Sequence, residues 1–484
     1  KVLDCVIGRR RITIQPPPSG LAKIFILKPV SKIQCGKFCQ QLNIRTASMD
    51  SYLKMMKNIA GLYRKYEAQM VKITPDAPDF ASFIENLNES QFHRMMAGIP
   101  TMFGALDDSL FRHTFAIENL KKLTESGNRW NKVLETTRDM PLSMDLTDSE
   151  QERWAFDIAD LLLDLYPLEE ELRRVDSRLI IEHRKYPVIL HLALKLALSK
   201  ISLKSISDPI FNSFIVAMYN EHNRIRANME HPSGEDFLRR KVSQLKWLFE
   251  GEIDKKWELI FVDDGCPEKS GEIATEIIHQ EKYNNVRILF LADGIEEGAP
   301  VTKELESTSD SQKGGAIQYG MWSAIKEHQG HDRHIVFFTD SDLSTNIAQA
   351  GLLLRQLEDQ NRMCAIGTRY SAGGVYCTPK GAMGVTDHDR LMLVFRHFIR
   401  SKLLPQIGEI IDTQCGFKAF KAEILKNVLD QMTDKRFSFD MELLLLTALQ
   451  RGSKDNFIGE APIVWIESNE ESNFYTAQGE ETEG

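Results

Sequence analysis

The sequence lacks the features that would assign it at once to a membrane, disulfide-rich or nucleic-acid-binding class. Its most apolar run, Pro187 to Ser199, is shorter than the roughly 18 residues of a bilayer span, and His191 and Lys195 interrupt it. The 7 cysteines are an odd, scattered set, unlike a disulfide framework. Cys35 and Cys39 have a spacing that zinc could use, but no second ligand pair follows, so small apolar residues are the favoured interpretation. We therefore expect no membrane span and a reducing, cytoplasmic setting.

An excess of basic charge is absent as well. Lys and Arg number 60 against 69 Asp and Glu, which gives a net charge of -9. A protein that binds nucleic acid mainly through its phosphates needs a basic stripe or tail, and the sequence contains none. We therefore expect no nucleic-acid partner.

Length and composition indicate several folded domains, because 484 residues with 42% apolar content can form more than one core. Residues 1–48, which contain runs of proline and arginine, are expected to be irregular or to hold a small β structure. In residues 49–206 apolar positions recur at spacings of three and four, which predicts an all-α domain of unknown role. Residues 476–484 are expected to form an acidic, mobile tail.

Residues 207–475 follow a different pattern, in which short apolar strands alternate with helical stretches. The predicted strands are Phe214–Met218, Glu258–Val262, Val286–Leu291, His334–Phe338 and Ala365–Gly367. This alternation predicts an α/β domain with a mostly parallel sheet, covered by helices on both faces. Ligands of such sheets bind beyond the carboxyl ends of the strands, so candidate site residues are sought there.

Acidic and amide side chains follow the first two predicted strands. Asn220 and Glu221 come after the first strand, and Asp263 and Gly265 come at the end of the second. Carboxylates and amides at strand ends suit the base and hydroxyls of a nucleoside, and a glycine lets the backbone approach it closely. An aspartate at a strand end is also a common cap for the next helix, and this alternative stays open.

The fourth predicted strand ends in Asp340, Ser341 and Asp342. Side chains at i and i+2 of an extended chain point to the same side, so the two carboxylates can converge as ligands for Mg²⁺ or Mn²⁺. Such a metal would neutralise a diphosphate leaving group. The alternative is an ordinary turn in which Asp342 caps the next helix.

Three cationic residues are candidates for binding phosphate. Lys313 and Gly314 open a predicted helix, whose free backbone N–H groups suit an anion, although a flexible linker would have a similar sequence. Arg369 and Arg390 could clamp phosphate through planar, permanently charged guanidinium groups. Arg390 lies in a basic amphipathic stretch, Asp389 to Leu404, which could either touch an anionic membrane surface or pack its apolar side into the domain.

Four motifs in a fixed order carry a resemblance to a known family. They are Val262 to Gly265, Asp340 to Ser344, Asp412 to Lys418 and Phe439 to Leu444. Together they resemble the family 2 inverting glycosyltransferases, and most of all the dolichyl-phosphate β-glucosyltransferases and related polyprenyl-phosphate glycosyltransferases, over about residues 208–474. The resemblance implies a Rossmann-like GT-A catalytic domain, here preceded by the all-α domain, with a nucleotide sugar lying across the strand ends.

The resemblance also implies roles for the residues that match the family's motifs. Those implied to hold the donor are Asn220, Glu221, Asp263, Gly265, Lys313, Gly314, Asp340, Ser341, Arg369 and Gln414. Asp340 and Asp342 would carry the metal. The implied catalytic residues are Asp440 as the base, Asp412 in the sugar and acceptor pocket, and Arg390.

The predicted function is therefore a transfer of a hexose, with glucose favoured, from a nucleotide sugar, with a UDP-sugar favoured. The reaction would invert the anomeric carbon and depend on Mg²⁺ or Mn²⁺, and the acceptor would be a polyprenyl phosphate or a soluble hydroxyl or phosphate. Met218 and Cys266 stand where the family usually has proline and Ser or Thr. The alternative is a catalytically silent GT-A-like binding protein whose helical part engages a partner. The sequence gives no indication of the oligomeric state.

Overall fold

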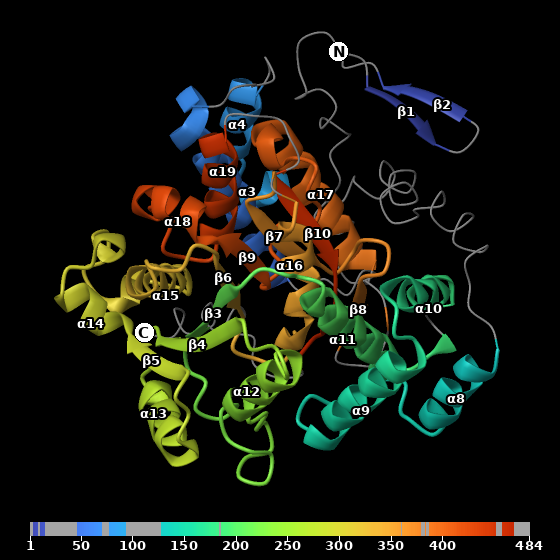
Figure 1. The fold of residues 1–484 in the computed structure, drawn as a ribbon. Coiled ribbons are helices and arrows are strands. Elements are labelled where there is room, and N and C mark those ends of the chain that lie inside the picture. Colours follow the sequence, from blue (N-terminus) through green and yellow to red (C-terminus); the bar gives the residue numbers. More distant parts are fainter. Residues whose placement is uncertain are drawn as a thin grey trace. The chain divides into compact units, whose positions relative to one another are not determined.

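The computed structural model describes residues 3–7, 10–14, 46–69, 77–92, 127–182, 185–359, 361–378, 383, 387–451 and 457–468 (Figure 1). The chain divides into two compact units. The first is Lys1–Thr114 with Val385–Ile411, and the second is Phe115–Gly384 with Asp412–Gly484. This division differs from the predicted boundary between residues 206 and 207, because the last helix before the sheet packs against a helix of the second unit. Cys35, Cys39 and the predicted tail lie outside the described residues.

The first unit combines segments that are far apart in the sequence. Strands β1 (Leu3–Ile7) and β2 (Arg10–Ile14) form an antiparallel pair within the segment for which a small β structure was expected. Helices α3 (Thr46–Tyr66) and α4 (Ala77–Glu85) both contact α17 (Asp387–Leu403). Phe80 of α4 meets Phe398 of α17 edge to face, with ring centroids 6.1 Å apart. The apolar side of the basic stretch therefore packs within its own unit.

The second unit is built on a sheet whose strand order, in the described residues, is β10-β7-β9-β6-β3-β4-β5. Its strands are β3 (Ile210–Met218), β4 (Lys255–Asp263), β5 (Val286–Phe290), β6 (His334–Thr339), β7 (Cys364–Thr368), β9 (Lys418–Lys421) and β10 (Ile458–Pro462). Only β9 runs antiparallel to its neighbours in this sheet. The predicted α/β fold with a mostly parallel sheet is confirmed, as are the five predicted strands.

The register of the central strands brings their carboxyl ends to one edge of the sheet. Met218 of β3 is paired with Asp263 of β4, and Val216 of β3 is paired with Thr339 of β6. The residues that follow these strands therefore emerge side by side. This edge is where the sequence places its acidic motifs.

Helices pack on the sheet through apolar contacts. They are α12 (Phe237–Leu248), α13 (Ser270–Glu281), α14 (Leu291–Glu296), α15 (Gly314–Glu327), α16 (Ala350–Leu357), α18 (Ala422–Val428) and α19 (Phe439–Arg451). Helix α15 lies close to β3 and β4 because Gly320 has no side chain: a Cβ there would stand 2.5 Å from Ile215 Cγ2. Inside the core, Phe214 and Phe337 stack with ring centroids 4.4 Å apart.

The helices α8 (Asn128–Thr137), α9 (Ser149–Leu165), α10 (Glu169–Ile181) and α11 (Val188–Lys204) also belong to this unit and lie together in Figure 1. Helix α11 is the most apolar run of the sequence, and it is almost wholly buried against α9 and α16. Lys195, within this run, pairs with Asp176 of α10 at 2.8 Å. Among the described residues, no helix has the length and apolarity to cross a membrane.

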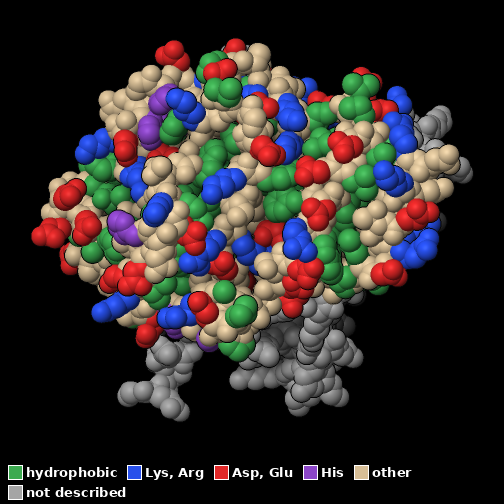
Figure 2. Space-filling view, turned by 60° about the horizontal axis from the view of Figure 1, so that its bottom comes forward, with side chains coloured by type: hydrophobic (Ala, Val, Ile, Leu, Met, Phe, Trp, Pro, Cys, Tyr) green, Lys and Arg blue, Asp and Glu red, His purple; other side chains and the backbone are tan. Residues whose placement is uncertain are grey.

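The face of the molecule in Figure 2 carries acidic and basic side chains that are interspersed. The two signs alternate over this face without gathering into a large patch of either one. This distribution agrees with the nearly balanced charged composition of the sequence.

Candidate active site

Three motifs from distant parts of the sequence meet at Asp340. This residue follows β6, and its Oδ1 is in contact with the Nζ of Lys313 at the start of α15. Gly416 packs directly against the carboxylate, because a Cβ at this position would stand 2.2 Å from Asp340 Oδ2. The Asp340 to Ser344 motif, the helix start at Lys313 and the Asp412 to Lys418 motif are therefore joined in one place.

Arg224 links the first strand end to the same loop. Its Nε and Nη2 donate to the two oxygens of Glu221, each at 2.6 Å, and its Nη1 lies 3.7 Å from Asp342 Oδ2. Ser341 Oγ donates to Glu221 Oε1 at 2.8 Å. Glu221 is thus held by an ion pair and a hydroxyl. Arg224 was not among the residues predicted for the site. The only available signal was its position three residues after Glu221 in an otherwise polar loop.

Charges of alternating sign determine how these groups ionise. Burial raises the pKa of Asp342, and the neighbouring Asp340 raises it further despite the opposing effect of Arg224. Burial acts in the same direction on Asp340, but Lys313 and other nearby lysines outweigh it and hold its pKa below the usual value. Burial lowers the pKa of Lys313, yet the contact with Asp340 more than compensates and leaves that pKa raised. Burial and Asp340 therefore disfavour the ionised form of Asp342, and a further cation beside it would favour that form.

Asp263 is engaged with the backbone. Its Oδ1 accepts hydrogen bonds from the N–H groups of Gly265 at 2.8 Å and Cys266 at 2.9 Å, and its Oδ2 accepts from Gly271 at 2.8 Å. These bonds fix the turn after β4 and the start of α13, so the helix-capping alternative describes its contacts. Nearby, the exposed Asn220 has a φ of 58°, and its N–H donates to Cys266 Sγ at 3.1 Å.

Asp264 is a buried acid beside Lys313 that the predicted site did not include. Its Oδ2 accepts a hydrogen bond from the backbone N–H of Lys313 at 2.7 Å. Within the described part of the chain its Oδ1 has no hydrogen-bond partner. Burial raises the pKa of Asp264 to about 6. Its place in the Val262 to Gly265 motif was the signal that could have identified it.

The glycines after Lys313 serve close packing. A Cβ on Gly314 would stand 2.6 Å from the carbonyl carbon of Lys435. The N–H of Gly315 donates to Lys435 O at 3.0 Å. The expectation that small residues leave the N–H groups of this helix start free for an anion is therefore wrong for Gly315, because the loop before α19 already uses that donor.

Arg369 and Asp412 form a bidentate pair. The Nε and Nη2 of Arg369 donate to the two carboxylate oxygens at 3.0 and 2.7 Å, and its backbone N–H donates to Oδ2 at 2.9 Å. Asp412 is only 2% exposed, and the guanidinium also lies over the rings of Tyr370 and Trp465. Burial lowers the pKa of Arg369, but Asp412 outweighs this and leaves the pKa well above its usual value. Gln414, in the same loop, is half-buried.

Asp440 is near the start of α19, and one of its two carboxylate oxygens is held by a lysine. Its Oδ2 pairs with Lys418 Nζ at 3.2 Å, while its buried Oδ1 has no hydrogen-bond partner among the described residues. Lys418 is fully buried, and its Nζ also donates to Cys415 O at 2.6 Å. Lys418 is the last residue of the Asp412 to Lys418 motif, and no role was predicted for it.

Arg390 is a further residue of the predicted site. It lies in α17, which belongs to the other compact unit, and its side chain is outside the described part of the structure. The proposed phosphate contact of Arg390 therefore remains a prediction.

Asp340 and Asp342 are the groups that could hold a divalent metal. No cluster of three or more His, Cys, Asp or Glu side chains is placed to bind one within the described residues. Mg²⁺ often takes only one or two protein carboxylates when substrate phosphates and waters complete its octahedral shell. The carboxylate oxygens of Asp340 and Asp342 are hard donors that fit such a site, although Asp340 is also in contact with Lys313.

Comparison with known proteins identifies the relatives of the chain. No family model matches it. A dolichyl-phosphate beta-glucosyltransferase of Trichomonas vaginalis is 26% identical over 275 residues, which cover 55% of this chain and 70% of that protein. The enzyme of the same name from Dictyostelium discoideum is 24% identical over 280 residues, covering 56% and 70%. The human one is 25% identical over 240 residues, covering 48% and 62%.

Among solved structures, a glucosyl-3-phosphoglycerate synthase from Mycobacterium tuberculosis is similar with a TM-score of 0.36 and 16% identity, covering 57% of this chain and 77% of that one. That structure contains Mn²⁺, UDP-glucose and phosphoglyceric acid.

With its mostly parallel sheet, its acidic strand ends and these relatives, the chain is a glycosyltransferase. More narrowly, its homologues are the dolichyl-phosphate β-glucosyltransferases of glycosyltransferase family 2. The resemblance and the enzyme class predicted from the four motifs are confirmed.

Proposed function

We propose that the protein transfers glucose from UDP-glucose to a polyprenyl phosphate, with inversion at the anomeric carbon and with help from Mg²⁺ or Mn²⁺. The observation that carries this proposal is the joining of Asp340, Lys313 and Gly416 in one cluster. Two of the four family motifs and the helix start at Lys313 thereby lie together at the carboxyl edge of the sheet, where ligands of α/β folds bind.

On the donor side, the residues at the strand ends are of types that suit the parts of a nucleoside diphosphate. Asn220, Glu221 and Gly265 lie at the ends of β3 and β4, where a nucleoside would be held. When bound by Asp340 and Asp342, Mg²⁺ or Mn²⁺ supplies positive charge to the departing diphosphate. Lys313 is next to these carboxylates and adds a second cation on the same side. Stabilisation of leaving-group charge in this way is commonly a large part of catalysis.

On the acceptor side, Asp440 is the proposed base. Its unpartnered Oδ1 can accept a proton from an acceptor hydroxyl, while Lys418 holds Oδ2 and fixes the orientation of the carboxylate. A phosphate acceptor would require less of this residue, because the second pKa of a phosphate monoester is about 6. Asp440 would then mainly orient the acceptor. The Arg369–Asp412 pair shapes the adjoining wall of the sugar and acceptor pocket in this proposal.

The name of the curated relatives makes dolichyl or another polyprenyl phosphate the first acceptor to test, and a soluble hydroxyl or phosphate the second. A cytoplasmic setting at a membrane face is part of the proposal, because a polyprenyl phosphate resides in a membrane.

The test is calorimetric titration of the full chain with UDP, GDP, dTDP and CMP in the presence and absence of Mn²⁺. We expect Mn²⁺-dependent binding of UDP that Asp342→Ala abolishes. The exposed Asp332→Ala, in the turn after α15, is the matched control and should bind as the wild type does. Absence of binding for every nucleotide, or full binding by Asp342→Ala, would refute the proposal. Transfer of radiolabelled glucose from UDP-glucose to a polyprenyl phosphate then tests the acceptor.

A further inference from the structure

One helix holds the backbone of the loop that carries Asp342. Lys241 of α12 donates from its Nζ to Asp342 O at 2.8 Å. One turn further along the same helix, Gln244 Oε1 accepts a hydrogen bond from the N–H of Ile347 at 2.9 Å. Both side chains are fully buried. The position of α12 therefore determines the path of the loop from Asp342 to Ile347.

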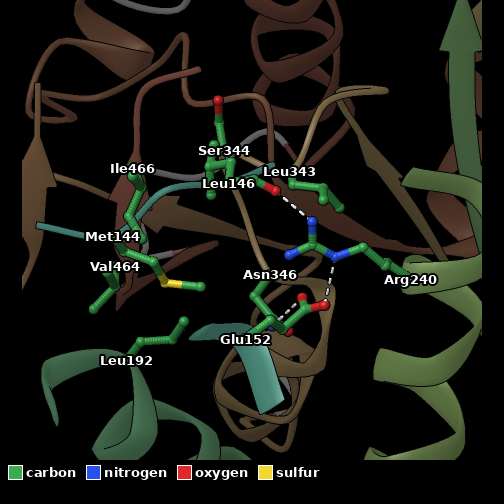
Figure 3. A pocket seen from close by; sticks show the side chains of 10 residues that line it. All are labelled: Met144, Leu146, Glu152, Leu192, Arg240, Leu343, Ser344, Asn346, Val464 and Ile466. Carbon is green, nitrogen blue, oxygen red and sulfur yellow. Dashed lines mark hydrogen bonds and ion pairs between the residues drawn. The ribbon is translucent and has the colours of Figure 1, made fainter. Parts of the chain in front are cut away.

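A carboxylate from the preceding helical segment binds both α12 and the loop. Glu152 of α9 accepts hydrogen bonds from Arg240 Nε at 2.7 Å and Gln244 Nε2 at 2.6 Å. It also accepts one from Asn346 Nδ2, in the loop, at 3.2 Å. Figure 3 shows Glu152 and Arg240 facing each other, with Asn346 beside the carboxylate. One side chain thus connects α9, α12 and the loop.

This connection is buried among mostly apolar side chains. Glu152 and Arg240 are 7% and 6% exposed, and apolar side chains such as Met144, Leu192 and Val464 line the pocket beside them (Figure 3). Among the described residues, Glu152 is the carboxylate that pairs with this guanidinium, and Arg240 Nη2 has no hydrogen-bond partner there. Removal of one partner of a buried ion pair leaves an uncompensated charge, which favours rearrangement of the groups around it.

We propose that Glu152 is a positioning residue for the Asp340–Asp342 loop. It acts through Arg240, Gln244 and Asn346, and it sets the geometry with which Asp342 meets the metal and the donor diphosphate. Glu152 precedes residues 208–474, which carry the family resemblance, so the helical segment becomes a working part of the transferase. This inference rests on the proposed function for its catalytic consequence, but the contact between Glu152 and the loop can be tested separately.

The first experiment measures the Mn²⁺ concentration that gives half-maximal UDP binding by Glu152→Gln in the full chain. Loss of a group that orients a metal ligand typically weakens metal affinity or activity 10–100-fold, and we expect a rise of about that size. Asp157→Asn is the matched control, because Asp157 is exposed on the same helix and should leave the value unchanged. A merely structural role of Glu152 would lower the melting temperature without shifting the Mn²⁺ dependence, and that result would overturn the inference.

A second variant covers the case in which Glu152→Gln does not fold. Replacement of a buried ion pair by apolar residues of similar volume is often neutral for stability, so Glu152→Leu combined with Arg240→Met removes the connection without leaving a buried charge. This double variant should fold and show the same rise of about 10–100-fold in the Mn²⁺ requirement. Folded protein with the wild-type requirement contradicts the positioning role.

Residue-resolved amide hydrogen exchange separates this inference from the proposed function. If the wild type binds no nucleotide with Mn²⁺, the proposed function fails, and the exchange rate of the Ile347 amide decides the positioning role by itself. We expect this amide to exchange at least about tenfold faster in the double variant, because Gln244 loses the carboxylate that fixes it. An unchanged rate at Ile347 would show that Glu152 does not hold the loop.

Discussion

Gly416→Ala is the substitution for which the structure makes the sharpest prediction. A Cβ at this position would stand 2.2 Å from Asp340 Oδ2 and 2.6 Å from its Cγ. An ordinary contact of a Cβ begins at 3.4 Å, so the carboxylate would have to retreat by 1.2 Å, the difference between 2.2 and 3.4 Å. Asp340 cannot make this movement without disturbing its contact with Lys313.

The size of the effect follows from that displacement. Misplacement of a reacting group by about 1 Å can lower the rate about 10²-fold, which corresponds to about 2.7 kcal/mol of transition-state stabilisation. Overpacking of a buried site also costs about 1–3 kcal/mol of folding stability. We therefore expect Gly416→Ala to fold, with a lower melting temperature, and to lose about two orders of magnitude in kcat/KM.

The assay is the initial rate of UDP release from UDP-glucose with Mn²⁺, measured beside urea unfolding of the same preparations. Gly330→Ala is the matched control, because Gly330 is exposed and nothing lies within 4 Å of the Cβ that it would gain. The control should retain both rate and stability. A Gly416→Ala protein that keeps its kcat/KM within about threefold of the wild type would refute the reasoning, since the displaced carboxylate would then be unimportant to catalysis.

Three further predictions concern acidic residues of the cluster. The pKa of Asp264 is about 6 in the folded chain and near 4 when unfolded, so the native state binds more protons between these values and the free energy of unfolding falls there as pH rises. Asp264→Asn should remove this contribution to the pH dependence, which is at most about 1.4 kcal/mol per pH unit. If urea unfolding from pH 4 to 7 gave identical profiles for variant and wild type, this prediction would be contradicted. Asp412→Asn should lower the free energy of unfolding by about 3–5 kcal/mol, because Arg369 stays buried without its counter-ion. A loss below about 1 kcal/mol in urea denaturation would show that this pair is solvated. Asp440→Asn should reduce turnover with a hydroxyl acceptor about 10²-fold or more while UDP still binds with Mn²⁺, and unchanged turnover would exclude it as the base.

The sequence allowed the elements of the second unit to be predicted because its strands are short, apolar and bounded by polar turns. Phe214–Met218 and His334–Phe338 were predicted from composition alone and lie within β3 and β6. Strand β9 was not predicted. It has only four residues, Lys418–Lys421, and its pairing between β6 and β7 depends on strands that are distant in the sequence.

The boundary between the two compact units could not be predicted from helical periodicity. Helical periodicity indicates that a segment has an apolar side, but it does not indicate which surface covers that side. Thus α11 packs against α16 of the sheet unit, whereas α3 and α4 pack with α17. Gly351 of α16 allows α11 to pack closely, because a Cβ at this position would stand 2.0 Å from Ser199 O of α11.

For the site, the amino-acid sequence alone determined the types of chemical groups and their places at strand ends, because hydrophobic periodicity and motif order are local properties of a chain. The tertiary structure decided which charges meet: Lys313 with Asp340, Arg369 with Asp412, and Glu152 with Arg240. It also decided that Asp263 is engaged with backbone N–H groups. The physical reason is that a buried charge must be compensated by whatever group the folded chain brings within a few ångströms, and sequence separation carries no information about that distance.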